Sequence, residues 1–328
     1  MVKSSKGPQA PDGWAHEESP FHEGEAAVQS RMGVRERMEQ IGRKVIRDFM
    51  PDQHREFYAT LPFVFIGGVD AAGQPWASIL VGPSGFAASP DPKSLIINAA
   101  PNVGDPLENA LVQGADVGLL GIELPTRRRN RINGRILKRN DHLIHVEVAQ
   151  SFGNCPKYIQ ARTHTLSASQ VTAPPSELVG EGLSPLDRKL VETADTFFIA
   201  SSSGKATGPS AGADVSHRGG KPGFIRIDDE KTLTTPDFIG NSLFNTIGNL
   251  MNEPRAGLLF IDWDAGDLLF LATKAEIIWG GSEVEAFSGA QRLIRFVITK
   301  TVRLPSVFPY RSSTPEISPF LERTGVWR

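Results

Sequence analysis

The sequence predicts a mainly β protein with short helices, in which two tandem barrel-like units follow an N-terminal helix. The 328 residues suffice for two domains, and 40% hydrophobic with 22% charged residues is typical of a soluble globular chain. The 32 glycines and 24 prolines predict many turns between short strands, a pattern typical of barrels and sandwiches. A third observation is that the strand pattern of the first half recurs in the second.

The segment before the first unit is predicted to be an arm followed by a helix. Residues 1–20 are polar and contain glycine and proline, so we expect a mobile arm. In residues 21–60, apolar side chains such as Val28, Met38 and Ile41 recur broadly at helical spacing from residue 25 onward. We expect this helical segment to pack across a barrel or a subunit seam.

The first unit is predicted to span residues 61–166. Its first apolar run, 63–66, is closed by a turn at 70–73. Apolar and alternating runs predict strands at 63–69, 75–81, 94–99, 117–122, 131–138 and 143–149, with a helix near 105–113. Residues 167–185, which contain a Pro-Pro pair and little periodicity, are predicted to be a linker.

The second unit, residues 186–304, repeats this plan. The run at 63–66 has a counterpart at 197–200, and the run at 118–122 has one at 257–261. The number of residues between the counterparts grows along the chain, as expected if loops were inserted into one of two copies. The expected strands are 196–200, 211–218, 223–227, 256–262, 267–273, 275–279 and 292–299, with a helix near 241–251. Residues 305–328 are predicted to be a C-terminal tail.

A basic, glycine-rich phrase at 216–224 directly follows a predicted strand. It brings together the donors that a phosphomonoester needs: Ser216, His217, Arg218 and Lys221, with open glycine backbone between them. The alternative is a basic, solvated hairpin turn.

Three asparagines recur every four residues downstream of that phrase. On a helix, Asn241, Asn245 and Asn249 would share one face and could hydrogen-bond a polar ring system or a phosphate. A solvated stripe, or simple capping by Asn241, is the alternative.

The chain resembles the pyridoxamine 5'-phosphate oxidase-like, FMN-binding split-barrel superfamily. The features that carry this resemblance are the duplicated strands, the phrase at 215–224, the asparagine helix, and the stretches 254–262 and 152–159. The similarity runs from about residue 21 to residue 301 and is closest to the two-unit bacterial flavin-nucleotide-binding type. The resemblance implies a Greek-key split barrel per unit, a homodimer, and FMN at a seam. Its phosphate would be bound by Arg218 and Lys221, supported by Ser216 and His217, with the asparagine helix lining the pocket. Because the first unit has an apolar stretch, 76–82, where the second has the basic phrase, we expect one site per chain.

The resulting hypothesis is an FMN-dependent oxidoreductase of a small molecule that takes electrons from NADH or NADPH. The sequence names no catalytic acid or base. The alternatives are a non-catalytic flavin-binding module and a haem-binding or haem-degrading split-barrel protein, for which His217, His142 or His164 would supply the axial ligand.

Other charged and ligating residues leave open roles. Five arginines between 127 and 135 could bind an anionic substrate, nicotinamide phosphates or an acidic partner, or could be a solvated hairpin tip: Arg127, Arg128, Arg129, Arg131 and Arg135. The phrase 22–25, with His22 and Glu25, is either an acid–base group near a site or a helix start. We expect no metal site, since His142 and His145 would point to opposite faces of a strand.

Charge and cysteine content predict the compartment and partners. A net charge of −2 lacks the positive field that nucleic-acid binding uses, so no nucleic acid is expected. Cys155 is the single cysteine, and the first residues contain no apolar stretch of signal-peptide type. We therefore expect a cytoplasmic protein that binds no membrane.

Overall fold

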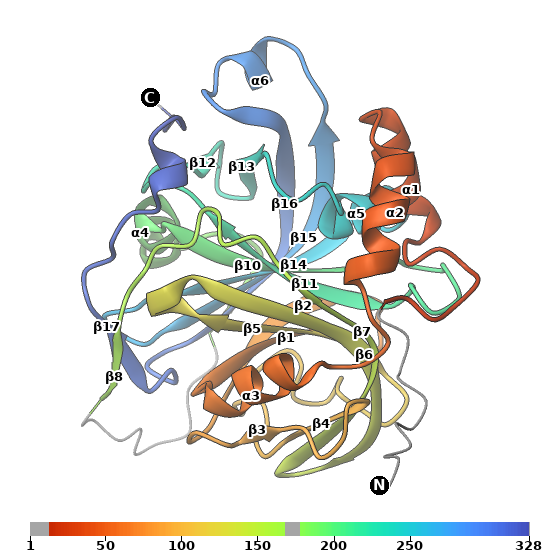
Figure 1. Cartoon of the computed structure of the whole chain (residues 1–328). Coiled ribbons are helices and arrows are strands. Elements are labelled where there is room, and N and C mark those ends of the chain that lie inside the picture. Colours follow the sequence, from red (N-terminus) through yellow and green to blue (C-terminus); the bar gives the residue numbers. More distant parts are fainter. Residues whose placement is uncertain (1–12, 168–177, 328) are drawn as a thin grey trace, which may run out of the picture.

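The computed structural model describes residues 13–167 and 178–327, and its first unit is a seven-stranded antiparallel sheet (Figure 1). The strand order is β2-β1-β5-β6-β7-β4-β3. The strands are β1 (Phe63–Val69), β2 (Pro75–Val81), β3 (Ala87–Ala88), β4 (Ser94–Ile97), β5 (Asp116–Glu123), β6 (Arg128–Asn140) and β7 (Leu143–Gly153), with a short 3-10 turn, η1 (Leu124–Thr126), between β5 and β6.

The second unit repeats this order as β11-β10-β14-β15-β16-β13-β12. Its strands are β10 (Thr196–Ser202), β11 (Ala213–Gly219), β12 (Arg226–Ile227), β13 (Thr232–Phe238), β14 (Arg255–Ile261), β15 (Leu268–Ile278) and β16 (Ala290–Leu304). The short β9 (Leu178–Gly180) adds to β16, and β8 (His164–Leu166) pairs with β17 (Tyr310–Ser312). The prediction of a mainly β protein with two tandem units is confirmed, and the strands within each unit pair antiparallel.

Strand registers fix which residues of the two units are equivalent. Ile66 pairs with Ser78 in the first unit, as Ile199 pairs with Ser216 in the second. The loop after this strand is also repeated. Gly82 packs on Phe86 and Gly220 on Phe224 so closely that a Cβ atom would overlap the ring. Ser78 and Ser216 are therefore structural equivalents. The residues next to them in β2 and β11 are equivalent at the same difference in residue number.

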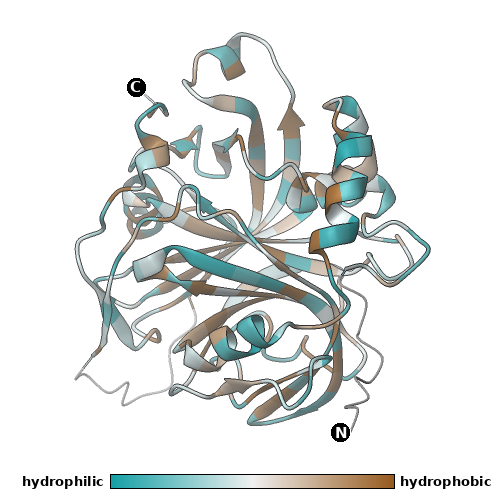
Figure 2. Ribbon diagram, viewed as in Figure 1, coloured by the Kyte–Doolittle hydropathy of each residue, from teal (hydrophilic) through white to brown (hydrophobic). Residues whose placement is uncertain are grey.

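The two sheets pack face to face around a pseudo-twofold axis. The equivalent rings of Phe65 and Phe198 stack on each other with centroids 3.5 Å apart. Gly118 of β5 lies against the backbone of Asp214 in β11, and Gly257 of β14 lies against the backbone of Trp76 in β2. Glycine is needed at both positions because a Cβ atom would be less than 3 Å from the facing chain. In Figure 2 the crossing strands at this centre are mostly brown and white.

The predicted helical segment over residues 21–60 is helical but is divided into three helices rather than forming one. They are α1 (Glu23–Arg31), α2 (Arg35–Val45) and α3 (Asp52–Thr60). Gly33 has a positive φ of 67°, which ends the first helix, and Pro51 disfavours helical backbone at the residue before it. Figure 1 shows α1 and α2 beside α5 of the second unit, while α3 covers the first unit. The N-terminal segment thus joins the two units.

The predicted arm and linker fall partly outside the described residues, which exclude 1–12 and 168–177. Within residues 13–20, Trp14 is buried, and its backbone N–H donates to the carbonyl oxygen of Arg43; the mobile arm stays a prediction. After residue 177 come β9 and α4 (Pro185–Thr193), which Ser184 caps.

The two units differ in one connection, which lies between β4 and β5 in the first unit and between β13 and β14 in the second. In the second unit this connection contains α5 (Asn245–Asn252), close to the predicted helix. The predicted helix near 105–113 is wrong, because the first unit has only turns there. The remaining elements are α6 (Ser282–Glu285) and η2 (Pro319–Leu321). Across 13–167 and 178–327, no helix is long and apolar enough to span a bilayer.

Candidate functional site

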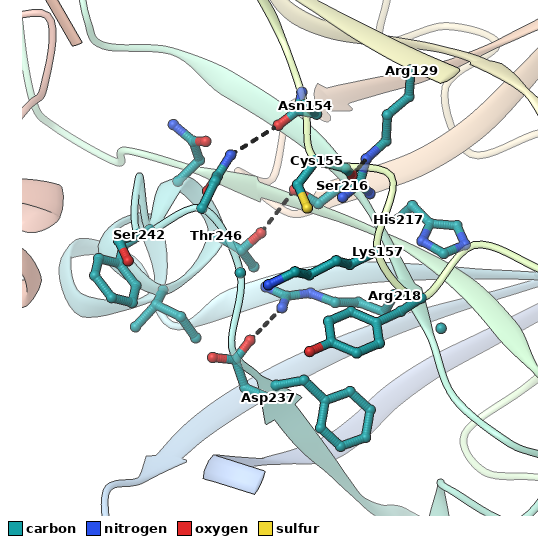
Figure 3. A pocket seen from close by; sticks show the side chains of 18 of the residues that line it. Arg129, Asn154, Cys155, Lys157, Ser216, His217, Arg218, Asp237, Ser242 and Thr246 are labelled. Atoms are coloured by element: carbon teal, nitrogen blue, oxygen red, sulfur yellow. Dashed lines mark hydrogen bonds and ion pairs between the residues drawn. The ribbon is translucent and has the colours of Figure 1, made fainter. Parts of the chain in front are cut away.

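A pocket of about 120 Å³ lies at the seam where β11 of the second unit meets β6 of the first. Figure 3 shows side chains from both units turned toward it. We call it the seam pocket. Its polar lining includes Arg129, Arg131, Asn154, Cys155, Lys157, Ser216, His217, Arg218, Asp237, Asn241, Ser242, Asn245 and Thr246, and its aromatic lining is Tyr158, Phe224, Phe238 and Phe244.

A buried ion pair joins the two units beneath the pocket. Arg131 pairs with Asp214 at 2.7 Å and donates from Nη2 to the Ser216 hydroxyl at 2.6 Å. Both charged side chains are nearly inaccessible, and Asp214 is 2% exposed. Burial raises the pKa of Asp214, while the charge of Arg131 lowers it. Thr246 of α5 also donates to Ser216, at 3.0 Å, so this hydroxyl ties three elements together.

Two further cations reach the pocket without a carboxylate partner among the described residues. Arg129 donates from Nε to the carbonyl oxygen of Cys155 at 2.7 Å, and burial, followed by the charge of Arg131, lowers its pKa to about 9. Lys157 lies 5.3 Å from the centre of the Phe320 ring. Positive charges without paired carboxylates create a binding site for an anion.

His217 is a neutral imidazole facing these cations. It is 6% exposed, and burial, followed by the charges of Arg129 and Arg218, lowers its pKa well below the usual range. Its Nε2 atom has no hydrogen-bond partner among the described residues. A buried polar atom without a partner is costly, so a ligand atom that bonds it would stabilise the site.

Arg218 is held by an acid on the opposite wall of the pocket. Asp237 bonds Arg218 through one oxygen and Arg292 through the other, the latter at 2.8 Å. The Nε atom of Arg218 is buried and has no hydrogen-bond partner in the part of the chain that the structure describes. One carboxylate therefore serves two guanidinium groups, and the pocket stays positive.

The structure brings together most of the residues that the sequence singled out. Ser216, His217, Arg218, Asn241 and Asn245 all line the seam pocket.

Two others are absent from its lining. Lys221 donates from Nζ to the carbonyl oxygen of Thr324 at 2.8 Å, and Asn249 donates to Ser201 at 3.0 Å. Asn241 also precedes α5, because Ser242 and Phe244 have left-handed backbone, so the three asparagines do not share a helix face.

The arginine cluster at 127–135 is divided between pocket and surface. Arg129 and Arg131 point into the seam, whereas Arg127 pairs with Glu316 and Arg135 with Asp116. The interpretation as a solvated hairpin tip is thus wrong for two of the five. The signal was their spacing of two residues, which places them on one face of a strand.

Among the described residues, the pseudo-equivalent seam, between β2 and β15, is apolar at most of the equivalent positions, although Ser78 there donates to the buried carboxyl group of Asp105. Strand registers place Leu268 and Phe270 where β6 has Arg129 and Arg131. The equivalents of Ser216, His217 and Arg218 are Ser78, Ile79 and Leu80. The four apolar side chains are buried in one cluster that Val307 and Phe308 complete. We call the two regions the polar seam and the apolar seam.

Comparisons with known proteins give structural neighbours. No family model and no curated protein sequence matches this chain. HupZ from Group A Streptococcus covers 36% of this chain and 91% of its own, at 13% identity and a TM-score of 0.30. A Lactobacillus delbrueckii protein whose name links it to pyridoxamine 5'-phosphate oxidase covers 38% of this chain and 97% of its own, at 11% identity and a TM-score of 0.30. An FMN-binding protein from Syntrophomonas wolfei covers 36% of this chain and 88% of its own, at 13% identity and a TM-score of 0.25. The names of two of these neighbours correspond to the family that the sequence resembles.

Proposed function

We propose that the seam pocket binds FMN and that the chain is an FMN-dependent oxidoreductase. The observation that carries this proposal is the convergence of Arg129 and Lys157, which have no carboxylate partner in the described part of the chain, with His217 and Arg218 at the polar seam. Cations, hydroxyls and aromatic rings in one pocket suit a ligand that has both a phosphate and a planar ring.

The phosphate end of FMN fits the residues present. Three buried nitrogen atoms of the pocket lining have no hydrogen-bond partner within residues 13–167 and 178–327, namely Nε2 of His217 and Nε of Arg218 and Arg131. A phosphate offers acceptor oxygens for the donors among these atoms, and its charge would be balanced by Arg129 and Lys157. Lys221 is left out of this set because it bonds the C-terminal tail.

The ring would lie toward the open mouth of the pocket. About 120 Å³ is smaller than the roughly 300 Å³ from which small-molecule pockets usually start. The rings of Tyr158, Phe238 and Phe244 line the same pocket and offer a stacking wall. The enclosed part thus suits the phosphate and the rim suits the heterocycle.

Bound flavin would supply the hydride chemistry, with NADH or NADPH as the proposed donor and a small molecule as acceptor. The chain's own residues would anchor and orient the cofactor. Arg129, Lys157 and Arg218 would hold the anionic end, while neutral His217 contributes a hydrogen bond without adding charge.

The test is an absorption spectrum of protein mixed with FMN and then desalted, followed by anaerobic NADH or NADPH. Retained flavin that bleaches, with turnover of an acceptor, supports the oxidoreductase. Retained flavin that stays oxidised with both donors supports a non-catalytic flavin-binding module instead. Loss of all flavin on desalting contradicts the proposal.

A haem-binding protein is the second candidate, and His217 is the observation that favours it. A neutral, buried imidazole with an unbonded Nε2 atom is able to ligate iron. Adding haemin and measuring the Soret band would test this. A band that shifts in wild type and not in His217→Ala supports haem, and equal spectra contradict it.

A further inference from the structure

Glu25 is a buried carboxyl group directly behind the wall of the seam pocket. It lies in the first turn of α1 and is 3% exposed. Its Oε2 atom accepts from the backbone N–H of His22 at 3.0 Å, and its Oε1 atom lies 2.5 Å from Nδ2 of Asn245. The phrase at 22–25 is therefore a helix start whose acid also contacts a pocket residue.

Tight packing of α1 on α5 fixes this contact. A Cβ atom at Gly24 would lie 2.2 Å from the carbonyl oxygen of Gly248, and one at Gly248 would overlap Glu25. Gln29, also fully buried, donates to the carbonyl oxygen of Leu243 at 3.2 Å just before α5. Helices held this closely leave the Glu25 carboxyl group no room to turn away from Asn245.

Asn245 connects the buried acid to the pocket. Its side chain lines the pocket, and one end of its carboxamide faces Glu25. Within the described part of the chain, no group donates to its other end. A carboxamide has a donor end and an acceptor end, so the group that fixes one end decides what the other presents.

We propose that Glu25 is a positioning residue that sets which end of the Asn245 carboxamide faces the seam pocket, and thereby the pocket's preference for ligand acceptors or donors. When protonated, Glu25 donates its O–H to Oδ1 of Asn245, and the NH2 group faces the ligand. When ionised, it accepts from Nδ2, and the carbonyl oxygen faces the ligand. No bond other than these hydrogen bonds changes, and the proton leaves to solvent.

The change falls in an accessible pH range. Burial raises the pKa of Glu25 to about 8, against the lowering effect of the hydrogen bonds from His22 and Asn245. The charged groups that act on it are Asp214 of β11, which raises the pKa, and Arg131 of β6, which lowers it. His22, with a pKa lowered to about 4 by burial, is neutral throughout. At neutral pH the pocket thus presents donors and cations, which suit an anionic, acceptor-rich ligand.

The test compares wild type with Glu25→Gln and Glu23→Gln in the ligand-free protein. Gln keeps the helix-capping bond and the contact to Asn245 but cannot ionise. Glu23 is exposed on the same helix and is the matched control. The side-chain NH2 resonances of Asn245, assigned with Asn245→Ala, are followed by NMR from pH 6.5 to 9.5. We expect them to move in wild type and Glu23→Gln and to stay fixed in Glu25→Gln. Resonances that move equally in all three, or in none, overturn the proposal.

The ligand preference rests on the proposed function and is measured separately. FMN affinity should fall about tenfold from pH 7 to 9 in wild type and Glu23→Gln, as expected for one hydrogen bond lost and one negative charge gained. In Glu25→Gln it should fall only about twofold, which is the loss that partial deprotonation of Arg129, whose pKa is lowered to about 9, would cause. An equal fall in Glu25→Gln overturns the ligand preference. If FMN does not bind at any pH while the Asn245 resonances still move, the proposed function fails and the role of Glu25 stands.

Discussion

The polar seam and the apolar seam are two versions of one structural arrangement with opposite contents. Equivalent strands of the two units meet at each seam. Among the described residues, the polar seam contains a buried ion pair and donors without a partner, whereas the apolar seam contains mainly packed aliphatic and aromatic side chains. Burying apolar groups stabilises a fold directly, whereas buried charges stabilise it only when paired. The apolar seam therefore serves stability, and the polar seam keeps groups that stability alone does not require.

The largest expected effect comes from giving the polar seam an apolar residue. Arg131→Leu should lower the free energy of unfolding by about 3–5 kcal/mol, because it leaves Asp214 buried without its partner. Denaturant unfolding measures this. The double variant Arg131→Leu with Asp214→Asn should lose less than the single variant, since no charge is then stranded. A single variant within 1 kcal/mol of wild type would show that the ion pair does not hold this seam.

The next effect separates binding from stability. Arg129→Ala should weaken FMN binding by about 1.5–3 kcal/mol, the loss of one charge-assisted hydrogen bond. Its equivalent in the apolar seam, Leu268→Ala, should instead lower the free energy of unfolding by about 2–5 kcal/mol and leave FMN affinity unchanged in the folded protein. Calorimetry with FMN and urea unfolding measure the two quantities. Equal affinity losses in both variants would remove the distinction between the seams.

Sequence reasoning predicted the repeated units, but it missed one strand that lines the pocket, β13, and the contact between the two units that forms the pocket. Short apolar runs and turn signals were enough to place β1, β2 and β5 and their counterparts, because these depend on local pattern. β13, which contains Pro236, was missed because proline argues against a strand interior. Arg131 contacts Ser216 only through the packing of the two units, and these residues are more than 80 positions apart in sequence. Local pattern carries no information on such a pairing.

The third effect is a pH dependence that belongs to the polar seam. His217 has a lowered pKa in the folded protein, so the unfolded chain binds a proton below about pH 6.5 that the folded chain does not. Stability should therefore be complete above that pH and fall as the pH decreases, by up to about 1.4 kcal/mol per pH unit. His217→Ile, which places the residue of the apolar seam at this position, should reduce the slope between pH 6.5 and 5. An unchanged slope would assign the dependence to other histidines, such as His22 and His54, whose pKa values burial also lowers.

The smallest effect is expected at Lys221, and it decides where the polar seam ends. This lysine belongs to the basic phrase that the sequence singled out, yet its ammonium group bonds the Thr324 carbonyl oxygen and is absent from the pocket lining. Lys221→Ala should change FMN affinity by less than about 0.5 kcal/mol, since a charge that makes no ligand contact acts only through screened solvent. Arg218→Ala, three residues away and on the pocket wall, should weaken binding by about 1.5–3 kcal/mol when measured in the same titration. If both variants lose affinity equally, the phosphate site extends to the C-terminal tail. If only Arg218→Ala does, the strand register, and not nearness in sequence, defines the site.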